Sequence, residues 1–169
     1  MFKSIRSHFN NIRSIKLLCE RAEAHALEDR QREPGAEHFL LASFDLPDGT
    51  ARLSFENIGA DPSGLRPAIH KQYIDPLIAL GVDADTAELV DMAPLPARNR
   101  LYDAAPSGKA VMQTLAKKRR EHRPLLGAHV VAVVAEMRHG VAARALRAMG
   151  IDPSRLKTAA ENMAGAHLA

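Results

Sequence analysis

Few residues of the chain have the types and spacing that nucleotide chemistry requires. A phosphate-binding loop needs a glycine five residues before the glycine of a Gly-Lys pair, and a hydroxyl residue directly after the lysine. The one Gly-Lys pair is Gly108-Lys109, and Asp103 and Ala110 occupy those two positions. The segment therefore offers neither a complete phosphate cradle nor a hydroxyl for magnesium, and we expect no nucleotide site.

The sequence also contains no pattern typical of a metal site or of covalent catalysis. The eight histidines are scattered, with no His-Glu-x-x-His pattern, whereas a zinc site needs convergent ligands. The single cysteine, Cys19, falls on an apolar helical face, where a buried and unreactive thiol is the default. Asp83 and Asp85 are explained as a helix cap and its solvated neighbour. We expect a non-catalytic protein without metal or cofactor.

The densest charge is the run Lys117-Lys118-Arg119-Arg120, with Arg123 beyond it. Such a run could contact phosphates, so a helical nucleic-acid-binding protein using Lys117 to Arg123 is one alternative. Four consecutive residues of a helix point all round it, however, and no aromatic residues interleave to stack on bases. A solvated helix end, where cations complement the helix dipole, is favoured.

The dominant feature of the sequence is an internal repeat, a signal that decides the fold before any other. A shift of 91 positions aligns residues 35–65 with residues 126–156 without a gap. The aligned identities are His38 with His129, Gly49 with Gly140, Ala51 with Ala142, Gly59 with Gly150, Asp61-Pro62-Ser63 with Asp152-Pro153-Ser154, and Leu65 with Leu156.

Helical patterns surround the repeated segments. In the first half we predict helices over residues 12–31, 36–44 and 50–58, and from Asp61 to about Leu80, with Pro76 kinking or splitting the last one. A left-handed Gly59 should end the third helix, and Asp61 should cap the fourth. A short helix over residues 83–90 and a linker over 92–100 should follow.

The second half should begin with a helix over residues 107–122, capped by Ser107. The run Val130-Val131-Ala132-Val133-Val134 would favour a buried strand if taken alone. Its counterpart Phe39-Leu40-Leu41-Ala42 has a helical pattern, so the repeat predicts a helix here as well. Two further helices should cover residues 141–149 and 152–164.

The N-terminus has two interpretations. Phe2, Ile5, Phe9, Ile12 and Ile15 recur at helical spacing among basic residues, and no acidic residue precedes Glu20. This pattern is typical of a transit peptide or a membrane-surface helix. The favoured interpretation is an extra helix that packs on the domain through its apolar stripe.

Composition agrees with an all-α protein. The chain has 169 residues, of which 46% are hydrophobic and only 4% aromatic. A core built from alanine and aliphatic residues favours helix over sheet. One cysteine excludes an internal disulfide and suits a reducing compartment, so we expect a cytoplasmic protein. No segment approaches the length of a membrane span, and a net charge of +3 says little about partners.

One family resemblance follows from the repeated motif. Small residues before Glu-His, an apolar run, then Gly49, Ala51 and a closing Gly-x-Asp resemble the Clp N-terminal repeat, the double four-helix module that precedes the AAA+ rings of Clp unfoldases. The resemblance implies a pseudo-twofold pair of four-helix repeats at residues 12–80 and 107–169. Residues 1–11 would be an added amphipathic helix, and residues 81–106 a lengthened connector with a short helix.

The resemblance also implies a function in binding. The partners would be protein substrates, adaptors or a Clp unfoldase, and the rival interpretation is a decoy or partner of a full-length unfoldase. In the family, the Glu of the motif helps to hold phosphorylated arginine. Ala36 replaces the usual threonine and Ala128 replaces the second Glu, so phosphoarginine is expected at the first repeat only. The implied ligand-binding residues are Gly35, Ala36, Glu37, His38, Gly127, Ala128 and His129.

Beside this implied role stands a simpler expectation for the two repeated histidines. A histidine near the start of a helix commonly packs and bonds to the nearby backbone. We therefore predict that His38 and His129 are structural, whatever their surroundings bind.

Overall fold

The computed structural model describes residues 2–83, 85–86, 95, 103–118, 120, 122 and 124–168, with side chains described from residue 11 onward. Within these residues every regular element is helical, which confirms the all-α prediction. The elements are α1 (Phe2–Glu28), α2 (Ala36–Ser43), α3 (Thr50–Asn57), the 3-10 turn η1 (Pro62–Gly64), α4 (Leu65–Ala79), α6 (Pro106–Lys117), α7 (Gly127–Ala135), α8 (Val141–Ala148) and α9 (Pro153–Leu168).

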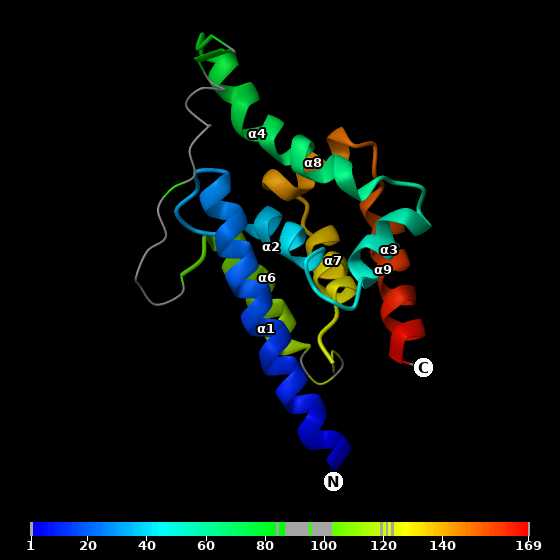
Figure 1. The fold of residues 1–169 in the computed structure, drawn as a ribbon. Coiled ribbons are helices and arrows are strands. Elements are labelled where there is room, and N and C mark those ends of the chain that lie inside the picture. Colours follow the sequence, from blue (N-terminus) through cyan, green and yellow to red (C-terminus); the bar gives the residue numbers. More distant parts are fainter. Residues whose placement is uncertain are drawn as a thin grey trace.

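Two short helices, α2 and α7, form the centre of the molecule and pack against each other. Every residue of α2 is buried, and so is every residue of α7 except Ala132. The longer helices cover them, with α1 on α2 and α9 on α7 (Figure 1). A helix buried on all sides needs apolar residues on all sides, which explains why both central helices are nearly free of charge.

The β-branched run on α7 is helical, as the repeat predicted. Val130, Val131 and Val134 are fully buried and Val133 is 5% exposed. Burial stabilises the fold by about 25 cal/mol for each Å² of apolar surface removed from water. This gain outweighs the few tenths of a kcal/mol by which valine disfavours a helix. Packing therefore outweighs the low helix propensity of the valines in α7.

The N-terminal prediction was wrong in one respect. Residues 2–11 do not form a separate helix, because α1 is continuous from Phe2 to Glu28. No glycine or proline interrupts this stretch, so nothing in the sequence stops the helix. In Figure 1 the N-terminal turns of α1 extend beyond the other helices.

The end of α1 also differs from the prediction, by three residues. The helix stops at Glu28 rather than at residue 31. Arg30 adopts a left-handed conformation with φ of 55°, and the N–H of Gln31 bonds back to the carbonyl of Ala26 at 2.7 Å. This six-to-one bond is the usual way to close a helix C-terminus.

The turns before the last helix of each half follow the prediction. Gly59 is left-handed at φ 76°, and Asp61 accepts the N–H of Ser63 at 2.8 Å. Gly150 at φ 70° and Asp152, which accepts the N–H of Ser154 at 2.8 Å, repeat both features. Side-chain capping of this kind holds the chain at the helix start.

Other boundaries need correction. Pro76 lies inside α4, which it does not split. Helix α6 is capped at Ala105, with Pro106 at its first position, and ends at Lys117 rather than at residue 122. Helix α9 continues four residues beyond the predicted end, to Leu168. The short helix predicted over residues 83–90 and the linker over 92–100 lie largely outside the described residues.

Candidate functional site

The first predicted site lies at the start of α2, where the chain supplies its own hydrogen-bond partners. The N–H of Gly35 donates to Nδ1 of His38 at 2.9 Å, and the N–H of Ala36 donates to Oγ of Ser107 on α6 at 3.1 Å. Ser107 was expected to cap its own helix and instead caps α2. His38 is fully buried, and its bond to the backbone confirms the structural role predicted for it.

Glu37, the residue expected to bind a guanidinium, is turned inward. It is 6% exposed, and its Oε1 accepts a 2.6 Å hydrogen bond from the phenol of Tyr73 on α4. Its carboxylate also lies over Gly35, where an added Cβ would clash with Oε1. Only glycine fits at position 35 while the carboxylate keeps this place.

Other polar side chains lie close to Glu37 in the interior. Nδ1 of His38 lies 3.6 Å from Oε1 of Glu37, and Nε2 lies 3.3 Å from Oδ2 of Asp29. Oδ1 of Asp29 accepts a 3.2 Å hydrogen bond from Arg66 on α4. Because Asp29 is 6% exposed, the guanidinium compensates a charge that would otherwise be costly to bury.

The second predicted site, at the start of α7, is closed by a different pair of residues. The N–H of Gly127 lies 3.2 Å from both carboxylate oxygens of Asp48, and the N–H of Ala128 donates to Oγ1 of Thr50 at 2.9 Å. A helix start is a natural anion site, and Asp48 already supplies the anion here.

His129 repeats the arrangement of His38. Its Nδ1 accepts the N–H of Leu126 at 3.1 Å, which confirms its predicted structural role. Its ring stacks on His122 with centroids 4.0 Å apart. Burial, helped by the neighbouring His122 and opposed by Asp48, lowers the pKa of His129 to about 4. The ring is therefore neutral near pH 7.

The structure does not bring the two predicted sites together. An added Cβ on Gly127 would meet the carbonyl of Ser43 at 2.7 Å, so α7 begins against the C-terminal end of α2. Gly35 stands at the opposite end of that helix. The two sets of residues are separate helix starts.

A third feature is an apolar groove that the sequence did not predict. The groove has a volume of about 230 Å³ and lies between α1 and α6, lined by Asn11, Ile15, Met112, Leu115, Ala116, His122 and Leu125. Ile15 is 41% exposed and its neighbour Ile12 is 51% exposed. The helical stripe that contains these isoleucines was visible in the sequence, but its exposure was not.

The described part of the chain offers neither a metal site nor a membrane span. It contains no group of three or more His, Cys, Asp or Glu side chains that could hold a metal ion. None of its helices is both long and apolar enough to cross a bilayer. In the basic run, Lys117 and Arg120 are exposed, while Arg119 and Arg123 lie outside the described residues.

No protein-family model matches the chain, and no curated protein matches it.

Proposed function

We propose that the chain is a non-catalytic protein-binding module, built from two Clp-N-like repeats, that captures an apolar segment of a substrate or adaptor protein. The repeat is supported by matched local geometry. His38 and His129 each accept the N–H of the residue three positions earlier. Gly59 and Gly150 also match, with left-handed φ of 76° and 70° before the last helix of each half.

Helix packing supports the same symmetry. If α2, α3 and α4 correspond to α7, α8 and α9, a twofold relation exchanges each contact with its counterpart. Helix α3 packs against α7 and α9, and α8 packs against α2 and α4. The contact between α2 and α7 is unchanged by the twofold relation, because the relation exchanges these two helices with each other. A pseudo-twofold arrangement is therefore the simplest account of the contacts.

The observation that carries the binding function is the groove between α1 and α6. Its lining is almost entirely apolar, and Ile15 exposes 41% of its surface there. A helix that leaves large apolar side chains beside a concave surface is typical of a protein interaction site. A side chain placed in the groove gains about 25 cal/mol for each Å² of apolar surface removed from water.

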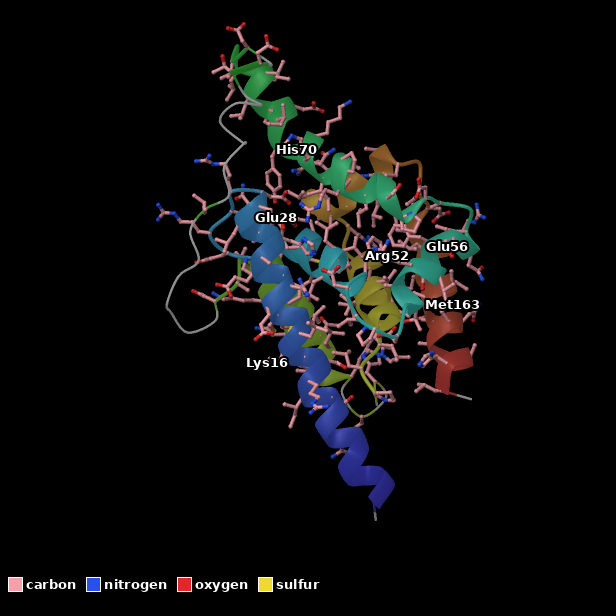
Figure 2. The ribbon with its side chains drawn as sticks, in the orientation of Figure 1. Lys16, Glu28, Arg52, Glu56, His70 and Met163 are labelled. Atoms are coloured by element: carbon pink, nitrogen blue, oxygen red, sulfur yellow. The ribbon has the colours of Figure 1, made fainter. Side chains whose placement is uncertain are left out.

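Charge near the groove favours acidic residues on either side of the bound apolar segment. Arg13 and Lys16 adjoin Ile15 on α1, and Lys117 and Lys118 follow Ala116 on α6. Lys16 keeps 75% of its side chain exposed and forms only a 3.6 Å surface pair with Glu20. Figure 2 marks Lys16 on α1. An apolar stretch between acidic residues would therefore match both the groove and its surroundings.

Binding can be measured by fluorescence anisotropy with a labelled peptide that has leucine and phenylalanine between aspartates. Ile15→Asp should weaken binding at least tenfold, or about 1.4 kcal/mol, because it places an unpaired carboxylate in an apolar site. Leu53→Asp is the matched control, since Leu53 is 49% exposed on α3, outside the groove. Equal affinity of the two variants would contradict the proposal.

Phosphoarginine is a second candidate ligand, restricted to the first repeat. The N–H groups of Gly127 and Ala128 already have partners, and Glu37 would have to leave Tyr73 to reach a guanidinium. Calorimetric titration should therefore give at most one weak site, abolished by Glu37→Ala. Two equal sites, or binding that is indifferent to Glu37→Ala, would mean that the ligand chemistry of the family does not operate through these residues.

A further inference from the structure

A hollow of about 620 Å³ opens where the end of α7, the helix α8 and the start of α9 meet. Its apolar lining includes Ala135, Met137 and Ala143, and its basic lining Arg138, Arg147 and Lys157. This hollow is distant in sequence from the residues of α1 that form the groove, and it shares no lining residue with that groove.

The alanines explain why the hollow exists. The 91-residue shift places Ala135 opposite Phe44 and Ala143 opposite Arg52. In the first half two large side chains occupy these positions, and the guanidinium of Arg52 lies over the Phe44 ring, 5.2 Å from its centroid. Arg52 is labelled on α3 in Figure 2. The second half has methyl groups at both positions and leaves the space open.

The cations around the hollow differ in what they already bind. Lys157 is paired with Glu136, which lowers the pKa of that carboxyl group. Arg138 and Arg147 are exposed, and neither forms an ion pair within the described part of the chain. The N–H of Ser154, at the start of α9, already donates to Asp152 at 2.8 Å. The two guanidinium groups, rather than the helix end, are thus the groups available to an anion.

We infer that this hollow binds a small organic anion with an aromatic or other flat apolar body. The body would replace the missing Phe44-like ring over Ala135 and Ala143, and the acidic group would reach Arg138 and Arg147. Guanidinium groups suit such acids, because their planar donors pair with two oxygens at once. This ligand is independent of the protein-binding function proposed for the groove.

Naphthalene-1-sulfonate is a suitable probe, and its binding can be measured by isothermal titration calorimetry. Arg138→Ala and Arg147→Ala should each weaken binding about tenfold, since each removes a charge-assisted hydrogen bond. Arg144→Ala is the matched control, because Arg144 is an exposed arginine of α8 that bonds Gln72 and does not line the hollow. Ala143→Leu should block the site, and Ile15→Asp should leave it intact.

Several results would overturn the inference. Binding that is unchanged in both arginine variants, or lost equally in Ile15→Asp, would place the probe elsewhere. Inorganic sulfate binding as tightly as the probe would remove the role of the apolar body. Absence of heat at millimolar probe would show that the hollow takes no such ligand.

Discussion

The phenol of Tyr73 on α4 donates a 2.6 Å hydrogen bond to the carboxylate of Glu37 on α2. Burial first, and then the charge of Glu37, raise the pKa of Tyr73 above its ordinary value of 10.0, so the phenol remains a donor at every physiological pH. The residue that the sequence offered as a ligand contact therefore also connects two helices of the first half.

Tyr73→Phe should lower the free energy of unfolding by about 1–3 kcal/mol, because it leaves a buried carboxylate oxygen without its donor. Urea denaturation measures this loss. The double variant with Glu37→Met should lose less than the sum of the single losses, since both substitutions remove the same bond. Strictly additive losses would mean that the pair contributes no coupling.

Asp48 is predicted to be a more important capping residue than Asp61. It accepts the N–H of Gly127 in the second half and the N–H of Thr50 in the first, so Asp48→Ala should cost about 2 kcal/mol. Asp61→Ala is the control, because Asp61 is exposed and caps only its own turn at Ser63, and it should cost about 0.5–1 kcal/mol. Chemical denaturation compares the two, and hydrogen exchange at the amide of Gly127 should accelerate only in the Asp48 variant.

Stability should depend on pH through His129. Its pKa is about 4 in the folded protein, against an ordinary value of 6.5, so the folded state binds fewer protons between these values. Stability is then full above about pH 6.5, falls as the pH drops and levels off below about pH 4, for a loss of at most about 3 kcal/mol.

His129→Gln isolates this effect. Its stability should vary less between pH 6.5 and pH 4 than that of the unmodified chain, whereas the exposed control His139→Gln should behave as the unmodified chain does. Thermal denaturation across this range tests both. Identical pH profiles for all three proteins would contradict a buried neutral ring.

The N-terminal turns of α1 should contribute little to stability. They extend beyond the other helices in Figure 1, so deletion of residues 1–9 should change the free energy of unfolding by about 0.5 kcal/mol or less. Asn11→Ala should cost about 1 kcal/mol, because Oδ1 of Asn11 accepts the N–H of Leu125 at 2.7 Å. A large loss on deletion would instead support the packing interpretation of this segment.

Much of the helical fold was predictable from the repeat. The alignment made α7 a helix despite its valines, and it fixed the positions of Gly150 and Asp152 from Gly59 and Asp61. Repeated sequence carries this information because equivalent residues meet equivalent surroundings. The continuity of α1 was missed because an expected family boundary outweighed the absence of any helix breaker.

The sites were less predictable. Asp48 and Ser107 each cap a helix in the other half of the chain, and sequence patterns carry capping information only over a few neighbouring residues. The exposure of Ile15 depends on how far α1 lies from α6, which no local pattern encodes. The hollow beside Ala135 could be predicted from the sequence, because the repeat aligns the large residues Phe44 and Arg52 with Ala135 and Ala143.

The most direct test of the binding function is the map of backbone amide shifts in NMR spectra as the acidic-flanked apolar peptide is added. If the peptide binds in the groove, the largest changes will occur at Ile15 on α1, Met112 and Leu115 on α6, and Leu125, with little change at Glu37 or Ala128. Changes centred on Glu37 and Ala128, or spread over no defined surface, would contradict binding in the groove.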